Sequence, residues 1–483
     1  MKKKALGSFS IVLLFVVFTP VLALKVDDGE AEFYLNPKVV QENRVEAFNT
    51  LLFDLAGFTD NATKMIKINE FMAEQQPYGF PVTHNDKIVF IYRTNNTLQV
   101  EIDGRMTGQV PLEHIEGTDF FHKQFTFYND SQGGYGFRED GGSMLKDPLN
   151  PDTLLVGIPP QFIVVSNFQM PEYTDDGAYL FSDTTGSVML NETIFSTKTN
   201  HNYTINIYLP AGYNDSQTQR YKSVYVADGE LYAYAWKARN TLDYLDFYNK
   251  IDPLIGVFIT PVDFSLYRNN DLTDNRKDHA DFIVEELMPY IDSNYRTFND
   301  STARAHLGSS HGGFFSLYLG AEYSDFFKLI GAHSPSQYAS QYLKQLFTDS
   351  SKVDGMRFYL NGGTYEQGIL NHAYSISEIL AEKGYAGKFR AFHQAHAAGQ
   401  WRATLGELLT FLFTDEASDY SGSPIMFGNI EIPSTTTTTT TNPETTSFGL
   451  TVPFFGLMIL ILVLQRKNSI FRITGKRKEK REG

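Results

Sequence analysis

The fold is decided by the stretch Arg304-Ala305-His306-Leu307-Gly308-Ser309-Ser310-His311-Gly312-Gly313, whose centre has the pattern G-x-S-x-G around Ser310. A serine on a sharp strand-to-helix turn has a strained backbone, so the residues two positions before and after it must be small. The apolar residues on either side can end a buried strand and open a helix, whose first N–H groups would lie close to the serine oxygen. The stretch therefore predicts Ser310 as a nucleophile. Ser309 is the alternative, at a less suitable place in the pattern.

Around this turn, apolar strands alternate with amphipathic helices from about residue 202 onward. The expected strands are 203–209, 223–227, 255–260, 305–307, 329–332, 357–360 and 389–392, and the clearest helices are 278–291, 369–383 and 400–413. Such alternation is typical of a doubly wound, mostly parallel α/β sheet. Ligands bind such sheets at the carboxyl ends of the strands, where Ser310, Asp228-Gly229 and the segments 362–366 and 393–396 all lie.

Two of these segments supply a candidate acid and a candidate base for the serine. Catalysis by a serine hydroxyl needs a base to take its proton and an acid to hold that base in the right tautomer. Glu366 follows a strand and is the preferred acid, whereas Asp354 precedes one, at the wrong end of the sheet. His396 is the preferred base. His393 is its competitor, and spacing alone does not separate the two.

A developing oxyanion would need backbone N–H donors, which we expect from His311 and from Glu230 in the loop after Asp228-Gly229. The His311 side chain is expected to pack or to face the substrate. The residues expected to bind substrate are Asp228, Gly229, Arg268 and Trp401. The sequence contains no H-E-x-x-H motif, no P-loop and no cysteine, so it predicts neither a metal nor another cofactor.

The region before residue 186 predicts a different architecture. A helical segment is expected over 25–80, with helices beginning at Asn36-Pro37 and over 62–73. Short strands at 87–92, 98–102, 120–127 and 161–165 then indicate a small β-sandwich over 81–185, before a catalytic domain over 186–416.

Composition limits the classes of partner. The chain has 483 residues and a formal net charge of -15, which argues against nucleic acid as a partner because phosphate binding needs a basic surface. The absence of cysteine excludes disulfides and thiolate catalysis.

Both ends of the chain predict a membrane-anchored surface protein. Residues 1–24 resemble a signal peptide or leader, 417–447 a threonine-rich stalk, 448–465 a transmembrane helix, and 466–483 a basic cytoplasmic tail. Because positive residues stay on the cytoplasmic side, the bulk of the chain is expected outside the cell. N-glycosylation sequons occur at Asn61, Asn95, Asn129, Asn191, Asn202, Asn214 and Asn299.

Over about residues 86–414 the chain resembles the enterochelin (siderophore) esterase family within the esterase D-like α/β-hydrolases. The motifs that carry this resemblance are Asp147-Pro148-Leu149-Asn150-Pro151, Val226-Ala227-Asp228-Gly229, the helical segment 281–291, the elbow 308–313, Gly363-Thr364-Tyr365-Glu366, and the spacing of His396 and Trp401. The resemblance implies an α/β-hydrolase domain preceded by an immunoglobulin-like β-sandwich. It also implies a Ser310–His396–Glu366 triad, and the histidine–tryptophan spacing favours His396 over His393.

The resemblance implies a serine esterase that forms an acyl-enzyme and acts on a small-molecule or glycan ester. His311 stands where the family usually has methionine, and Gln394-Ala395-His396 replaces the usual glycine-glycine-histidine. These departures leave the substrate open. Two alternatives remain: a non-catalytic surface binding protein on a hydrolase scaffold, and an envelope acyltransferase.

Overall fold

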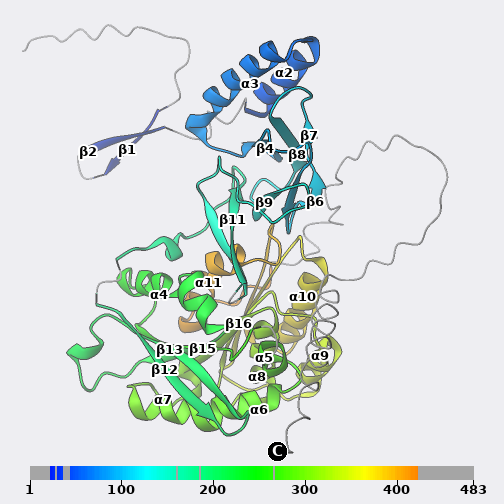
Figure 1. Ribbon diagram of the computed structural model, residues 1–483. Helices are drawn as coiled ribbons and strands as arrows, with labels where there is room; N and C mark the ends of the chain where they lie inside the picture. Colours follow the sequence, from blue (N-terminus) through cyan, green and yellow to red (C-terminus); the bar gives the residue numbers. More distant parts are fainter. Residues whose placement is uncertain are drawn as a thin grey trace, which may run out of the picture. The chain divides into compact units, whose positions relative to one another are not determined.

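A single eight-stranded sheet organises the larger part of the chain in the computed structural model, which describes residues 22–27, 30–35, 44–158, 161–183, 186–264 and 267–421 (Figure 1). The strand order is β12-β13-β15-β14-β16-β17-β18-β19. The strands are β12 (Val188–Ser196), β13 (His201–Leu209), β14 (Lys222–Ala227), β15 (Leu254–Thr260), β16 (Arg304–Ser309), β17 (Leu329–His333), β18 (Arg357–Gly363) and β19 (Ala386–Phe392).

The sheet is mostly parallel, as predicted. The pairs β15·β14, β14·β16, β16·β17, β17·β18 and β18·β19 are parallel, whereas β12·β13 and β13·β15 are antiparallel. The sequence analysis missed β12. Most of its residues are exposed or half-buried. The polar residues 191–193 divide its apolar residues into two short groups, so no continuous apolar run reveals this edge strand.

Helices cover both faces of the sheet. One face packs against α5 (Tyr267–Leu272), α6 (Arg276–Asp281), the π-helical turn η6 (Phe282–Leu287), α7 (Met288–Asn294), α8 (His311–Glu322), α9 (Ser340–Asp349) and α10 (Gln367–Glu382). The other face packs against the π-helical turn η5 (Leu231–Ala235), α4 (Ala238–Phe247) and α11 (Ala398–Phe413). The two apolar clusters are separate, as expected of a sheet buried on both faces.

The helix predicted over 278–291 is interrupted. Its residues form α6, the π-helical turn η6 and α7, and Met288 N–H bonds to the Ile283 carbonyl five residues earlier. Pro289, in the first turn of α7, has no N–H to donate, so the regular hydrogen-bond ladder cannot pass through it.

Between residues 44 and 169, the described part of the chain contains two smaller sheets and a helical pair. The sheets have the orders β3-β4-β8-β7 and β10-β11-β9-β5-β6. Their strands are β3 (Val82–His84), β4 (Lys87–Arg93), β5 (Val100–Gly104), β6 (Gly108–Pro111), β7 (Glu113–His114), β8 (Phe120–Thr126), β9 (Gln132–Glu139), β10 (Thr153–Ile158) and β11 (Gln161–Gln169). Aromatic side chains from both sheets share one core, including Phe90, Phe125, Tyr135 and Phe168. The two sheets thus pack face to face, while the immunoglobulin-like assignment stays a prediction.

The helices α2 (Arg44–Gly57) and α3 (Asn61–Gln75) cover the other face of the β4 sheet, where Val89 and Ile91 join their apolar residues in one cluster. Asp60 caps α3 by accepting a hydrogen bond from Thr63 N at 2.7 Å. Both helices lie within the predicted helical segment. The expected helix start at Asn36-Pro37 lies outside the described residues.

The predicted targeting segments fall almost entirely outside the described residues. Residues 1–21 of the expected leader are not described, whereas 22–24 belong to β1 (Leu22–Asp27), which pairs antiparallel with β2 (Glu30–Leu35). Of the expected stalk only 417–421 are described, and the expected transmembrane helix and basic tail are not. No helix within the described ranges has the length and apolar character needed to cross a bilayer.

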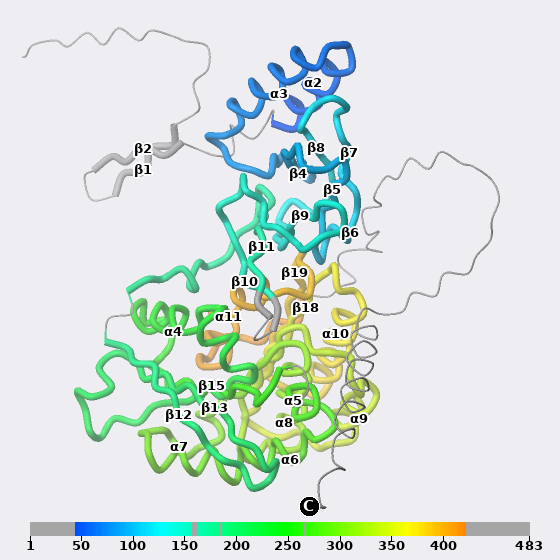
Figure 2. Tube along the Cα trace, viewed as in Figure 1, coloured from blue at the N-terminus to red at the C-terminus, as the bar shows by residue number. Residues whose placement is uncertain are grey.

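The five-stranded sheet contacts the domain of the large sheet, because its strands β9 and β10 contact α11 (Figure 2).

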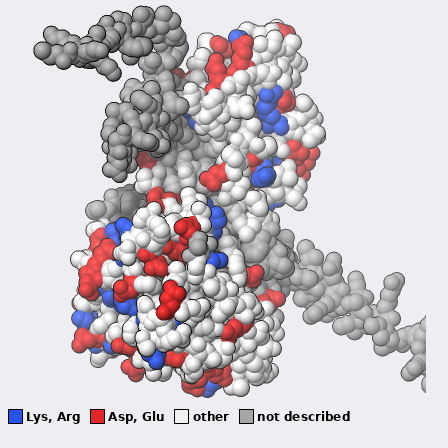
Figure 3. All heavy atoms as spheres, turned by 90° about the vertical axis from the view of Figure 1, so that its left-hand side faces the viewer, with Lys and Arg blue, Asp and Glu red and all other residues white. Residues whose placement is uncertain are grey.

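The surface charge is mixed on the face drawn in Figure 3, where acidic and basic side chains of the described residues are interspersed.

Asp271 provides a test of the core beside β13. It is 3% exposed and accepts a hydrogen bond from the Tyr203 hydroxyl at 2.8 Å, and burial raises the pKa of its carboxyl to about 6. An unfolded aspartate has a pKa near 3.9, so the ionised carboxylate destabilises the folded state progressively from about pH 4 to about pH 6 and fully above that. Asp271→Asn should therefore raise the free energy of unfolding by about 3 kcal/mol near pH 7.5 and by much less near pH 4.5. Urea denaturation at the two pH values measures the difference.

The control for this measurement is Asp325→Asn, because Asp325 is exposed. An equal effect of Asp271→Asn at both pH values would contradict the argument.

Candidate functional site

Ser310 lies on the turn between β16 and α8 with a backbone conformation of φ 55° and ψ −119°. This region is strained for any residue that has a side chain, and such strain persists only where the surroundings enforce it. Three backbone hydrogen bonds do so here: Ser310 N donates to His333 O at 2.9 Å, and Ser310 O accepts from Phe314 N at 3.0 Å and Ser336 N at 2.9 Å. The turn is therefore held by its own helix and by the loop after β17.

The glycine pattern around Ser310 has the expected steric cause. A Cβ at Gly308 would lie 2.6 Å from the carbonyl carbon of Gly312, closer than real side chains approach a backbone. The two glycines thus let strand and helix meet at the turn, which is the geometry that the G-x-S-x-G spacing predicts.

Glu366 and His396 are brought together. Nδ1 of His396 lies 2.5 Å from Oε2 of Glu366. The other carboxylate oxygen, Oε1, accepts hydrogen bonds from Ser334 Oγ at 2.5 Å and Gly363 N at 2.6 Å, and the Glu366 side chain is only 5% exposed. A carboxylate that accepts from Nδ1–H fixes the tautomer, which leaves Nε2 of the neutral ring as the proton acceptor.

Trp401 packs against the pair formed by Glu366 and His396. It is buried, its Nε1–H donates to Ser334 Oγ at 3.1 Å, and its ring meets the His396 ring edge-on, with 4.8 Å between centroids. The sequence analysis expected Trp401 to bind substrate. The structure shows it packed against the histidine and bonded to the serine that bonds to Glu366, and its contact with a substrate stays a prediction.

The structure gives His393 a different partner. Its Nδ1 lies 2.5 Å from Asp130 Oδ1, and its ring stacks on Tyr128 at 3.8 Å. Asp130 and Tyr128 both follow β8 in the smaller sheets. The structure thus decides which of the two histidines pairs with Glu366, a question that spacing alone left open.

The Ser310 hydroxyl and the His396 ring are not hydrogen-bonded to each other among the described residues. They nevertheless belong to one rim of the sheet, because Ser310 follows β16 and His396 follows β19. Between them, the loops after β17 and β18 supply Ser334 and Glu366. Hydrogen bonds between a nucleophile and its base often tighten only when substrate is bound.

The two expected oxyanion donors lie at the ends of adjacent parallel strands. His311 opens α8 directly after Ser310. Glu230 comes directly before η5, separated from the end of β14 by Asp228-Gly229. The first turn of a helix leaves backbone N–H groups without intrahelical partners, so His311 N meets the chemical requirement for a donor.

The His311 ring has its own environment. Its Nδ1 lies 2.8 Å from Ser336 Oγ. Burial, and after it the positive charge of Arg268, lowers the pKa of His311 to about 4. The imidazole is therefore neutral at physiological pH.

The remaining expected substrate residues form an enclosed group. The Asp228 side chain has no exposed surface and binds Arg268 through two hydrogen bonds of 2.5 and 2.6 Å. Gly229 is required by close packing, since a Cβ there would lie 2.3 Å from the backbone of Phe258 in β15. Only Arg268, 12% exposed, presents any of this group to the surface. The Asp228 side chain thus holds Arg268, and a role of either residue in binding substrate stays a prediction.

The loop after β17 is the part of the site that the sequence analysis missed. Ser334 (φ 41°) and Ser336 contact Glu366, Trp401, Ser310 and His311. The sequence did contain a signal for this loop, because it follows a strand that a parallel sheet places beside the strand that leads to Ser310.

In the part of the chain that the structure describes, no three His, Cys, Asp or Glu side chains are arranged to hold a metal ion.

Comparisons with known proteins agree with this geometry. Residues 196–412 match the model of the family Esterase, described as "Putative esterase". The uncharacterised protein YjcH of Bacillus subtilis is 27% identical over 177 residues, which cover 36% of this chain and 72% of YjcH.

Two solved structures share the fold at 18% sequence identity. The enterobactin esterase of Shigella flexneri, crystallised in the presence of enterobactin, matches with a TM-score of 0.60 over 68% of this chain and 92% of its own. The ferric enterobactin esterase of Salmonella typhimurium matches with a TM-score of 0.61 over 68% and 93%.

Proposed function

Because the α/β domain of this chain belongs to the esterase family and is a carboxylic ester hydrolase, we propose that it acts through a triad of Ser310, His396 and Glu366. The observation that carries the proposal is the bond between Glu366 and His396, at the same rim of the sheet as the strained serine turn. A carboxylate–imidazole pair beside such a turn is the arrangement that activates a hydroxyl for attack on a carbonyl.

The proposed reaction has two steps. Ser310 Oγ attacks the ester carbonyl while its proton passes to Nε2 of His396, and the same proton then leaves with the departing alcohol. The acyl group remains on Ser310 Oγ. In the second step water attacks the acyl carbonyl and gives a proton to Nε2 of His396. The bond between the acyl carbon and Ser310 Oγ then breaks, His396 returns the proton to Oγ, and the acid leaves. Glu366 keeps the ring oriented and stabilises the imidazolium in both steps.

The tetrahedral intermediates carry a negative charge on oxygen. We assign its stabilisation to the backbone N–H groups of His311 and Glu230, which follow adjacent strand ends.

The substrate class is a small-molecule or glycan ester. Asp228 neutralises the only cation of the group described above, Arg268. The His311 ring is neutral and binds Ser336 through Nδ1, so Nε2 remains for a further hydrogen bond. The site thus offers neutral hydrogen bonding more than net positive charge, which suits uncharged polar esters. The enterobactin named for the Shigella flexneri enzyme makes a catecholate trilactone one of the esters to test.

We propose further that the domain lies outside the cell, held by the hydrophobic segment 448–465 behind a threonine-rich stalk. Support comes from the seven sequons, because six of their asparagines are exposed and Asn129 is half-buried. An acceptor asparagine must be accessible to be glycosylated.

The triad is tested first by active-site labelling. A fluorophosphonate should label the wild-type protein on Ser310, and Ser310→Ala should abolish both the labelling and ester hydrolysis. The matched control is Ser309→Ala, which removes the neighbouring buried hydroxyl and should leave labelling intact. Glu366→Gln should lower kcat by about 10²- to 10⁴-fold with a small change in KM, because the imidazolium loses its counter-charge.

Absence of labelling on the folded wild-type protein would contradict the triad and support the binding-protein alternative. A strong shift of product toward a new ester when an acceptor alcohol is added would support the acyltransferase.

The pH profile tests the roles of the two histidines near Ser310. Since the pKa of His311 is lowered to about 4, its ring is already neutral across the range from about pH 6 to about pH 8 where histidine bases operate. His311→Gln should therefore leave the shape of the kcat/KM profile unchanged in that range, whatever its effect on absolute activity. Loss of an ionisation from the profile of this variant would identify His311 as the base in place of His396.

Surface exposure is tested on the chain expressed in its own host. Treatment with peptide-N-glycosidase should reduce its apparent mass, and extracellular protease should release the domain from intact cells. A chain with unchanged mass that stays protected from protease would contradict the proposed location.

A further inference from the structure

Ser334, in the loop after β17, is a fully buried serine in a strained backbone conformation, with φ 41°. A positive φ favours glycine, so a residue with a side chain at this place calls for a reason. Ser334 N donates to the carbonyl and to the side-chain Oδ1 of Asn361, each at 3.1 Å, which ties the backbone to β18. The hydroxyl is therefore held in one place.

The direction of the Ser334 hydroxyl proton follows from its two partners. Trp401 Nε1 lies 3.1 Å from Ser334 Oγ, and an indole N–H can only donate. The other partner, Glu366 Oε1 at 2.5 Å, belongs to a carboxylate, which can only accept when it is ionised. Ser334 thus accepts from Trp401 and donates to Glu366. The indole N–H polarises the hydroxyl and makes it a stronger donor.

This donated bond changes the charge that Glu366 presents to His396. Oε1 accepts from Ser334 Oγ and from Gly363 N, while Oε2 faces Nδ1 of His396. Hydrogen bonds to one oxygen of a carboxylate draw negative charge toward that oxygen, so Oε2 carries less of it. An imidazolium at His396 is therefore stabilised less than it would be without the Ser334 bond.

The charged groups near His396 on the side of α8 balance one another. A charge on His396 lowers the pKa of His311, so the two rings are close in space. Burial, and after it the charge of Arg268, brings that pKa to about 4, which leaves the His311 ring neutral near pH 7. Arg268 itself is paired with Asp228. Where a histidine base operates, Glu366 is therefore the charge that acts most directly on His396.

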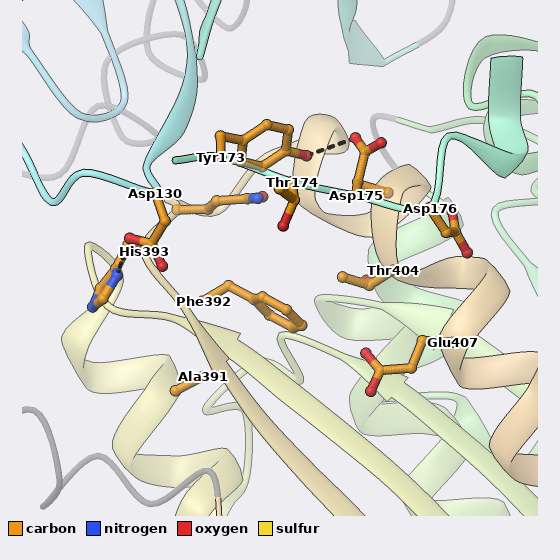
Figure 4. Close-up of a pocket in the computed structure, with 12 residues that line it drawn as sticks. Asp130, Tyr173, Thr174, Asp175, Asp176, Ala391, Phe392, His393, Thr404 and Glu407 are labelled. Atoms are coloured by element: carbon orange, nitrogen blue, oxygen red, sulfur yellow. Dashed lines mark hydrogen bonds and ion pairs between the residues drawn. The ribbon is translucent and has the colours of Figure 1, made fainter. Parts of the chain in front are cut away.

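The loop of His396 is also anchored at a second place. His393, three residues earlier, contacts Asp130 at 2.5 Å, at the edge of the cavity drawn in Figure 4. On the other side of the pair, the Gly363 N–H holds the carboxylate at 2.6 Å. Loss of the Ser334 hydroxyl should therefore change the charge beside the imidazole more than its position.

We propose that Ser334 is a positioning residue that acts on His396 through Glu366. Its hydrogen bond limits the negative charge beside the imidazole and so lowers the pH above which the ring can accept a proton. Trp401 orients the hydroxyl that makes this bond. The inference rests on the proposed triad, to which it adds a residue that tunes the base from a buried position.

The rate at which a fluorophosphonate labels Ser310 on the full chain, measured from about pH 5 to about pH 9, tests this inference without knowledge of the natural ester. Labelling needs a neutral base, so the rate falls toward low pH with a midpoint set by that base. Ser334→Gly removes the donor and suits the positive φ. Its midpoint should lie on the order of 0.5 to 1 pH unit higher than in the wild-type protein, the shift expected from losing one hydrogen bond.

Two further serine variants separate this effect from a merely structural one. Ser334→Ala keeps the strained φ and should be less stable than Ser334→Gly, but it should shift the midpoint equally because both lack the donor. The matched control is Ser336→Ala, which removes a hydroxyl of the same loop that contacts His311. It should leave the midpoint where it is, whatever its effect on the maximal rate.

The contribution of Trp401 is tested by a double-mutant cycle. Trp401→Phe keeps an aromatic ring beside His396 but removes the N–H, so it should shift the midpoint in the same direction by a smaller amount. In the Ser334→Gly background the same change should cause no further shift, because its effect passes through the serine.

The outcomes distinguish this inference from the triad on which it rests. A labelled Ser334→Gly variant with the wild-type midpoint would overturn the inference and leave the triad standing. An equal shift in Ser336→Ala would overturn it too, since the effect would then belong to the loop as a whole. Absence of labelling on the folded wild-type protein would overturn the triad and the inference together.

Discussion

The Glu366 carboxylate is the contact on which the site depends. Its two oxygens accept from three different segments: Gly363 N in its own loop, Ser334 in the loop after β17, and His396 in the loop after β19. A carboxylate buried to this extent is stable as an anion only when its lone pairs are satisfied, so the same bonds that permit its burial also fix the loops. Ser334 extends the network to Trp401, whose ring backs the histidine. The hydrogen bonds that allow the Glu366 carboxylate to be buried therefore also hold the His396 ring in place.

Residues that follow β8 in the smaller sheets also contact these loops. Tyr128 and Asp130, after β8, hold His393, three residues before His396, by stacking and by a charged hydrogen bond. Tyr128 N also donates to the hydroxyl of Tyr365, the neighbour of Glu366. The loop that carries Glu366 and the loop that carries His396 are therefore both attached to the region of the smaller sheets. A loop with such attachments loses less entropy when it orders around a substrate.

How well a feature could be predicted from the sequence depended on how far apart in the chain its interacting residues lie. The turn at Ser310 was predictable because its cause is local. A side chain at Gly308 would clash with the backbone of Gly312, within the same five-residue stretch. The strand ends were predictable because parallel sheets place them at one edge. The choice between His393 and His396 depended on partners 263 and 30 residues away, which spacing does not encode and only the resemblance to a family could favour. The structure assigns Glu366 to His396, while the roles of both residues in catalysis remain proposals.

Asp228 and Gly229 show another limit of prediction from the sequence. Their position after β14 correctly placed them at the rim, but position does not tell whether a side chain faces a ligand or another part of the protein. Asp228 is turned onto Arg268, and Gly229 is packed on β15. In the ion pair the charges of Asp228 and Arg268 neutralise each other, and the nearby His311 ring is neutral as well. Under the proposed function, a neutralised rim leaves the choice of ester to shape and hydrogen bonding, and we propose His311 and the loop after β17 as the groups that make this choice.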